Sequence, residues 1–193
     1  MTHYDPYARL GLDPTFAVTS DDMADGAPLR LRLRSSGIGG SDTSPQLAWS
    51  GFPPETKSFA VTAFDPDAPT GSGFWHWAVY NIPASVTSLP AGAGDPGGAL
   101  LPAGAITLAN EYRLEQYSGA QPPEGTGTHR YFFVVHAVDT EHLEIPAGST
   151  PAVLGFNLFF HALGRAILVP TAAFDDDADA IAEPEDRRLS SIG

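Results

Sequence analysis

The sequence predicts a mainly β domain, either a sandwich or a barrel, and three observations support this fold class. The chain has 193 residues, which suits one domain with a sizeable core. Glycine and proline are abundant, at 20 and 18 residues, and they separate short apolar segments that are typical of strands. Long heptad repeats, which would indicate packed helices, do not occur.

The composition argues against several classes of protein. The formal net charge is −13, and a chain this acidic would be repelled by nucleic acid. There is no cysteine, so neither a disulfide framework nor thiol chemistry is expected. No apolar run is long enough to span a membrane, and the N-terminus lacks the basic start and apolar core of a signal peptide. We therefore expect a cytoplasmic protein without a transmembrane segment.

The first clear strand is expected at residues 29–34, where leucine and arginine alternate strictly. Alternation with a period of two would bury the leucines and expose the arginines. Residues 1–20 are expected to form an irregular arm in which a strand could begin near residue 16. Residues 36–54 form a long loop with a short strand at 47–49, and long ordered loops are often functional.

Residues 58–83 are expected to form two strands joined by an acidic turn. The apolar run 59–64 has the length of a buried strand, and the second strand covers 75–82. The turn DPDAP at 65–69 contains two prolines, which lack N–H donors and fix their own φ angles. The ladder between the strands therefore cannot continue through the turn.

This turn carries two carboxylates, Asp65 and Asp67, close to His76. One interpretation is an ordinary surface turn, because aspartate and proline favour turns for local reasons. The other is a preorganised site, because a turn stiffened by proline loses little conformational entropy on binding. The segments that follow in the chain favour the second interpretation.

Residues 117–127, YSGAQPPEGTG, form a second cluster of turn residues. Pro122 and Pro123 make the X–Pro bonds here candidates for a cis peptide. The cluster is followed by His129 and Tyr131, which lie next to the strand described below.

A strongly β-prone strand is expected at 132–138. Its alternation places His129 and Tyr131 on one face and His136 on the other. The two histidines should therefore not act together.

One helix is expected at 153–169, and Pro170 ends it. Because this segment is apolar on most sides, it should pack deeply. The domain is expected to occupy residues 1–174, and the acidic residues 175–193 are expected to form a flexible tail.

The polar candidates form one constellation: Asp65, Asp67, His76, His129 and Tyr131. Imidazole and tyrosine can donate hydrogen bonds, and carboxylates can accept them and orient the imidazoles. Such a cluster suits a small oxyanion or phosphate, with loop N–H groups as further donors. It also suits a phosphorylated head group with an amine, since the two aspartates could accept from the ammonium.

Three motifs in this order resemble the phosphatidylethanolamine-binding proteins, and the form is closest to the bacterial Raf-kinase-inhibitor-like branch: DPDAP, GFWHWAVYNIP and YSGAQPPEGTGTHRYFF. The segment SDTSPQLAWSGFPPETKSFA also resembles a loop of that family. The resemblance covers residues 29–166. It implies two antiparallel sheets with Greek-key connections, together with peripheral helices that include one near the C-terminus.

The resemblance also implies one small pocket for phosphate or phosphoryl head groups, with no cofactor and no metal. Carried over position by position, the pocket residues are Asp65, Asp67, Pro69, His76, Pro122, Pro123, His129 and Tyr131. The family's turn often contains a cis peptide, which is expected here on the same basis.

This chain departs from the family pattern at two places. Asp42 replaces the usual asparagine of the first loop: if it faces the pocket, anion affinity should fall, and if it faces the backbone, little changes. Ala120 and Gln121 stand where bacterial relatives tend to have glycine or proline followed by cysteine, so the rim of the pocket is expected to differ.

Three functions are compatible with these residues. The favoured one is a non-enzymatic binding protein for a small anionic or phosphorylated ligand, which modulates a protein kinase or another protein partner. The alternative is a phosphoester hydrolase that uses the Asp/His cluster with a metal or by acid–base catalysis. Motifs such as GxSxG and HExxH are absent, which disfavours the enzyme. The third is an interaction protein with a vestigial pocket, which forms a homodimer through an edge such as 29–34.

Overall fold

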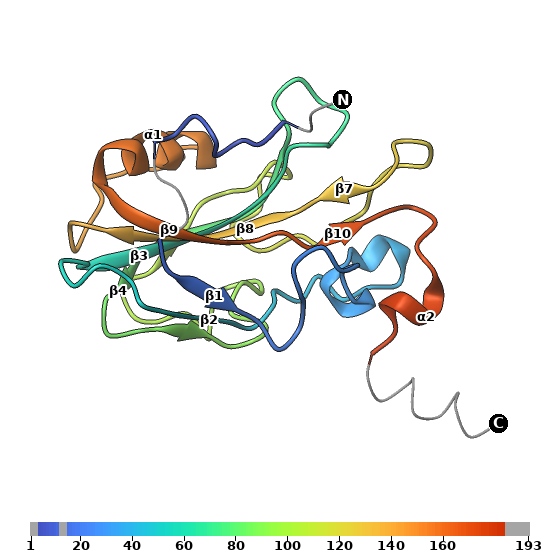
Figure 1. The fold of residues 1–193 in the computed structure, drawn as a ribbon, viewed down its shortest axis with the longest axis horizontal. Helices are drawn as coiled ribbons and strands as arrows, with labels where there is room; N and C mark the ends of the chain where they lie inside the picture. Colours follow the sequence, from blue (N-terminus) through green and yellow to red (C-terminus); the bar gives the residue numbers. More distant parts are fainter. Residues whose placement is uncertain (1–3, 12–14, 184–193) are drawn as a thin grey trace.

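A computed structural model describes residues 4–11 and 15–183 as layers of antiparallel strands with a helix on one side (Figure 1). The central sheet contains, in spatial order, β6 (Ile106–Thr107), β4 (Phe74–Pro83), β3 (Ser58–Asp65), β8 (Phe132–Val138) and β9 (Ala162–Leu168). A smaller sheet contains β1 (Ala17–Thr19), β2 (Leu47–Ser50) and β5 (Ser88–Leu89). A third pairing joins β7 (His129–Arg130) to β10 (Thr171–Ala172). The predicted mainly β fold is confirmed.

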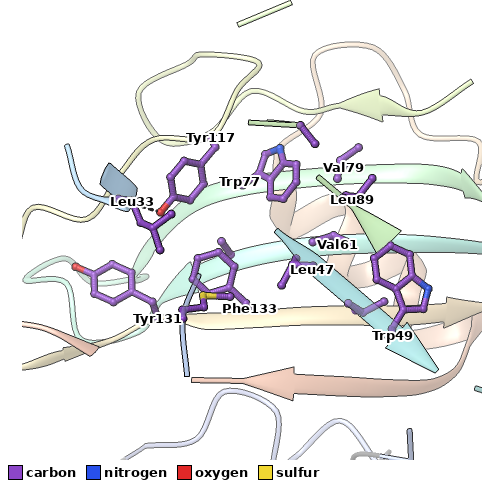
Figure 2. Close-up of a cluster of buried hydrophobic side chains, with 14 of the residues drawn as sticks. Leu33, Leu47, Trp49, Val61, Trp77, Val79, Leu89, Tyr117, Tyr131 and Phe133 are labelled. Atoms are coloured by element: carbon purple, nitrogen blue, oxygen red, sulfur yellow. Dashed lines mark hydrogen bonds between the residues drawn. The ribbon is translucent and has the colours of Figure 1, made fainter. Parts of the chain in front are cut away.

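The main core lies between the central sheet and the smaller sheet. Alternate residues of β3, including Phe59 and Val61, are fully buried on this side. Trp49 of β2 packs edge to face on Phe59, with ring centroids 5.3 Å apart. Figure 2 shows Leu47 of β2 near Val61 and Phe133 of the central sheet, with Trp49 farther along the same strand. The strands expected at 59–64, 75–82 and 132–138 thus form the centre of the fold.

The opposite face of the central sheet is covered by α1 (Pro151–His161) and by the N-terminal segment (Figure 1). Leu154 and Leu158 of α1 pack with Ala60 of β3. Tyr7 packs with Phe132 of β8. Alternate residues of the central strands point to opposite faces of the sheet, and each face packs against a different apolar layer. A shift by one residue would exchange the two faces, so this packing fixes the register of the sheet.

Residues 29–34 do not form the expected strand. Leu31–Leu33 is a short 3-10 helix, closed by hydrogen bonds from the Leu33 and Arg34 amides to the Arg30 and Leu31 carbonyls. Leu29 and Leu33 are buried as expected, but Arg34 is buried too, with 2% of its surface exposed. Strict alternation here does not produce a strand, so residues 29–34 do not supply the sheet edge named as one example of a dimer surface.

The expected helix at 153–169 is only half a helix. The chain is helical over Pro151–His161 and then passes directly into β9, which pairs with β8. Pairing in the sheet overrides the helical tendency of the sequence ALGRAIL. The expected deep packing is also wrong for part of α1, because Phe156, Phe159 and Phe160 are exposed. Neither α1 nor α2, the helices of the described ranges, is long and apolar enough to cross a membrane.

The segment expected to be a flexible tail, residues 175–193, contacts the domain in its first part. Asp176 accepts a hydrogen bond from the buried guanidinium of Arg34. The short helix α2 (Ala178–Ile181) follows directly. Residues 184–193, the remainder of the expected tail, lie outside the described residues.

His136 occupies a buried position on the face of β8 that meets the N-terminal segment. Its ring centroid lies 6.1 Å from that of Tyr7. Burial, and then the positive charge of Arg165, lower the pKa of His136 from 6.5 to about 3. The folded protein therefore holds this ring neutral.

We predict that Asp176→Asn lowers the free energy of unfolding by about 3 kcal/mol, because it leaves the Arg34 charge buried without its carboxylate partner. Ending the chain after residue 174 should lower the free energy of unfolding by a similar amount. The control is Asp175→Asn at the neighbouring exposed position, which should change stability by less than about 0.5 kcal/mol. Urea unfolding of the three variants checks this, and an unchanged midpoint for Asp176→Asn would contradict it.

We also predict that stability falls as the pH is lowered from 6.5 towards 3. The unfolded state binds a proton at His136 in this range and the folded state does not, so the loss from this group is about 1.4 kcal/mol per pH unit. In His136→Phe, urea unfolding across this pH range should show a shallower slope. An identical slope in both proteins would show that His136 is protonated without cost.

Candidate functional site

A small cavity of about 190 Å³ lies where β3 ends and where β4 and β7 begin, next to the loop that carries Pro122 and Pro123. The structure brings seven of the eight predicted residues to it: Asp65, Pro69, His76, Pro122, Pro123, His129 and Tyr131. Four further lining residues were not predicted: Ala68, Thr70, Phe74 and Tyr112. The last lining residue is Gln121, which the sequence placed at the rim of the pocket.

Asp65 organises the acidic turn. Its Oδ1 accepts hydrogen bonds from the amides of Asp67, at 2.8 Å, and Ala68, at 3.0 Å. Its Oδ2 accepts a hydrogen bond from Nδ1 of His129 at 2.7 Å. The carboxylate thus closes the DPDAP turn and ties it to β7, as the predicted orienting role requires.

His129 connects the acidic turn to the proline loop. Its Nε2 lies 2.8 Å from Oγ1 of Thr126, whose hydroxyl donates to the carbonyl of Pro123 at 2.7 Å. Both ring nitrogens therefore have partners within the protein. His129 therefore holds the wall of the cavity through both of its ring nitrogens.

Asp67 does not line the cavity. Its carboxylate forms a two-pronged ion pair with Arg130, with distances of 2.7 Å to Nε and 2.8 Å to Nη2, and it also accepts from the Arg130 amide. Burial opposes ionisation of Asp67, but the hydrogen bonds from Arg130 outweigh it and lower the pKa of the carboxyl. Asp67 fixes the outer side of the turn, and the prediction that it belongs to the pocket is wrong.

His76 presents a free ring edge in the cavity. Its Nδ1 donates to the carbonyl of Ser118 at 2.7 Å, and its ring lies between Phe74 and Tyr131, with centroid distances of 4.8 and 5.1 Å. Among the described residues, Nε2 has no hydrogen-bond partner. Burial lowers the pKa of His76, and the Ser118 carbonyl and the charge of Asp65 only partly oppose this. The ring is therefore neutral at pH 7, with the lone pair of Nε2 available.

Tyr131 supplies the hydroxyl of the site. Its side chain is buried, and burial followed by the negative charge of Asp65 raises the pKa of the phenol. A hydrogen bond to the Asp65 carboxylate adds to this effect, so the hydroxyl keeps its proton and its oxygen can accept a further hydrogen bond. As predicted, the strand parity separates this residue from His136, which lies on the other face of the sheet.

The loop around Asp42 meets the loop around Gly119. Asp42 accepts hydrogen bonds from the amides of Ser36, at 3.0 Å, and Gly119, at 2.7 Å. It faces the backbone, which is the second of the two expected alternatives. A Cβ atom at position 119 would lie 2.2 Å from the carbonyl carbon of Arg34, so only glycine allows this approach.

Asn110 and Arg130 are positioning residues that sequence reasoning missed. The Nδ2 of Asn110 donates to Oγ of Ser118 at 2.8 Å and to the carbonyl of Gln116 at 3.0 Å. Asn110 thereby fixes Ser118, whose carbonyl accepts the hydrogen bond from His76. For Arg130, the only signal in the sequence was its position directly after His129. Nothing in the sequence linked Arg130 to Asp67, which lies 63 residues away.

The backbone differs from one further expectation, and the side-chain arrangement bears on the metal-dependent alternative. No cis peptide bond occurs in the described residues, so the cis bonds expected in the DPDAP turn and at Pro122 and Pro123 are not present. Within the described ranges, no three His, Asp or Glu side chains are grouped so that they could hold a metal ion. Asp65 and Asp67 are each engaged by a basic side chain instead.

Comparison with known proteins now decides the family. The sequence profile of the family described as "Phosphatidylethanolamine-binding protein" matches residues 19–173. The chain belongs to the phosphatidylethanolamine-binding protein family. The resemblance seen in the three motifs is therefore confirmed.

Relatives of this phosphatidylethanolamine-binding protein family member include two proteins of Escherichia coli K12, both described as UPF0098 proteins. YbcL is 46% identical over 80% of this chain and 86% of its own length. YbhB is 46% identical over 80% of this chain and 97% of its own length. The crystal structure of YbcL superposes with a TM-score of 0.79, covering 82% of this chain and 98% of that chain at 45% identity.

We predict that Gly119→Ala lowers the free energy of unfolding by about 1–3 kcal/mol, because the new methyl group meets the backbone of Arg34 rather than a side chain that can move. It should also displace Ser118 and disturb the His76 ring. The control is Gly71→Ala, two residues after the acidic turn, where a methyl group would meet nothing within 4 Å. Thermal unfolding and the ring signals of His76 in NMR spectra provide the readout, and equal stability of the two variants would contradict the close approach.

Proposed function

We propose that this chain is a non-enzymatic, cytoplasmic binding protein whose small cavity holds a phosphate or a phosphoryl head group. The observation that carries the proposal is the free edge of His76, which lines the cavity together with Tyr131. The neighbouring side chains of Asp65 and His129 are hydrogen-bonded to each other. The cavity thus offers two polar groups to a ligand and keeps its remaining charges paired.

The protonation state of His76 determines how it recognises an anion. Its Nδ1 proton is directed at Ser118, so a neutral ring can only accept at Nε2. A monoprotonated phosphoryl group can donate to that lone pair. Otherwise the ring takes up a proton, and a bound anion favours this because it raises the pKa of an adjacent imidazole. In both cases the bound complex holds one proton between ligand and ring.

Recognition of an amine is not part of the proposal. The sequence suggested that two aspartates accept from an ammonium group, but Asp67 is paired with Arg130 outside the cavity. Asp65 already accepts three hydrogen bonds. The ligand contact is therefore with the phosphoryl group, and the rest of a head group would project towards the rim at Tyr112 and Gln121.

The hydrolase alternative has less support from the geometry. A metal-dependent mechanism would need the carboxylates of Asp65 and Asp67 as metal ligands, but these carboxylates are paired with His129 and Arg130. An acid–base mechanism would use His76 alone. Modulation of a kinase and formation of a homodimer are retained as parts of the proposal, although the geometry of the cavity adds no support to either.

We predict that sulfate, which stays dianionic at these pH values, binds more tightly as the pH is lowered from 8 to 5.5. Binding couples to protonation of His76, whose pKa is depressed in the free protein and raised by the anion. His76→Asn keeps a donor for Ser118 but lacks Nε2. It should lose about tenfold or more in affinity, together with the pH dependence. Isothermal titration and amide shifts in NMR spectra provide the measurements.

The matched control is Asp67→Asn, which should bind sulfate within about twofold of the wild type because Asp67 lies outside the cavity. Equal sulfate affinity in His76→Asn and the wild type would overturn the proposal. Hydrolysis of a phosphomonoester by the wild type but not by His76→Asn would replace it with the hydrolase.

A further inference from the structure

A second and larger cavity lies on the opposite face of the central sheet, between the sheet and its cover of α1 and the N-terminal segment. Its volume is about 440 Å³, which is within the range of small-molecule sites. Thr62 and Phe64 of β3 line it, whereas Val61 and Ala63 of the same strand lie in the main core. This cavity and the phosphoryl cavity have no lining residue in common.

Most of the wall is built from apolar and aromatic side chains. The N-terminal segment contributes Leu10, the central sheet contributes Phe64 and Trp75, and α1 contributes Leu158. A molecule placed against such a wall gains dispersion contacts and removes apolar surface from water. The wall therefore suits a ligand with an apolar surface.

The polar side chains in the wall are buried and contact one another. Thr62, His136 and Arg165 are each between 2% and 4% exposed. The hydroxyls of Tyr7 and Thr62 share a hydrogen bond, and Nε2 of His136 lies 3.5 Å from Oγ1 of Thr62. Nδ1 of His136 is covered by protein atoms and presents almost no surface to the cavity. These groups hold the N-terminal segment on the sheet rather than offer a contact to a ligand.

The charges beside the cavity do not favour a charged ligand. Burial is the main cause that raises the pKa of Tyr7 to about 12 and lowers the pKa of His136 to about 3, so both side chains are neutral at pH 7. Arg165 and Asp5 act on the Tyr7 phenol with opposite sign. A charged group inside the cavity would therefore lose its hydration without gaining an unopposed partner.

Exposed aromatic side chains of α1 stand where the cavity meets solvent. Phe156 and Phe159 line the cavity although they are 67% and 58% exposed. Phe160 packs on both rings, with centroid distances of 5.2 and 5.1 Å. Apolar side chains gathered on a surface mark a binding site. Because two of these rings also belong to the cavity wall, a molecule that enters the cavity contacts them, whereas a flat protein or membrane surface would leave the cavity empty.

We propose that this cavity binds a small uncharged molecule of hydrocarbon type, which enters past Phe156 and Phe159. Since a cavity of about 150 Å³ holds benzene, the larger volume here suits a molecule of roughly ten to fifteen carbon atoms. The apolar surface of the ligand lies against Leu10, Phe64 and Leu158. The buried polar side chains keep their contacts with one another in the complex.

Gly155 provides the test of the site, and naphthalene, which is uncharged and at the lower end of this size range, is the probe. Gly155 lines the cavity from α1, and a Cβ atom there would meet nothing within 4 Å. Gly155→Trp should fill part of the cavity and lower the affinity for naphthalene about tenfold or more in isothermal titration. The matched control is Val153→Trp on the same helix, which is partly exposed and does not line the cavity. Its affinity should stay within about twofold of the wild type.

Selection against charge is tested with 2-naphthoate and 2-naphthylmethylammonium, which carry the same ring system. Inside the cavity their charges lose water, so both should bind about tenfold or more weakly than naphthalene. On an open surface the charged groups would stay hydrated, and the three affinities would be similar. In NMR spectra of the full wild-type chain, naphthalene should shift the amides of Thr62, His136 and Gly155, which locates the site even if a variant fails to fold.

Three results would overturn the proposal. They are the absence of saturable naphthalene binding to the wild type, equal affinity in folded Gly155→Trp and the wild type, and similar affinities for the three ring compounds. Competition with saturating sulfate would also overturn it, because it would place the ring in the phosphoryl cavity. Self-association or vesicle binding that is lost in Phe160→Ser, without naphthalene binding, would assign the exposed rings to a surface contact instead. Failure of the phosphoryl proposal would appear separately, as an unchanged response of His76→Asn to sulfate.

Discussion

The hydrogen bond between Asp65 and His129 is the contact on which the small cavity depends. One oxygen of the carboxylate closes the proline-rich turn through two backbone amides, and the other holds the imidazole. The imidazole in turn reaches the proline loop through Thr126. Asp65 and His129 lie 64 residues apart in the chain. Their hydrogen bond holds the acidic turn and the proline loop at a fixed separation, and His76 and Tyr131 can face the space between them.

Arg34 has a comparable role beneath the proline loop. Its backbone pairs with Ala120, and its side chain binds the Leu29 and Ala173 carbonyls and the Asp176 carboxylate. The close approach at Gly119 depends on this backbone. The loop that carries part of the cavity and the C-terminal segment therefore rest on the same buried arginine, so the stability of the domain and the shape of the cavity are linked.

The set of cavity residues came from the resemblance of three motifs to the family. The sequence alone was sufficient for the central strands, because they depend on local signals. Proline interrupts the ladder at 65–69, and apolar runs of strand length flank it. Alternation at 29–34 was misleading because the segment closes into a 3-10 turn with about three residues per turn, so that Arg34 is buried next to Leu33. The direction of the Asp67 side chain depends on Arg130, a partner brought near only by the pairing of distant strands. No pattern local to the turn could have predicted it.

The direct passage from α1 into β9 has a consequence for how this chain can change in length. His161 ends the helix and Ala162 begins the strand, so no loop residue lies between them. An inserted or deleted residue here could not be absorbed locally. It would either rotate α1 by about 100° relative to the sheet or exchange the two faces of β9. Length variation should therefore be found in the glycine- and proline-rich surface loops, while this junction keeps a constant spacing.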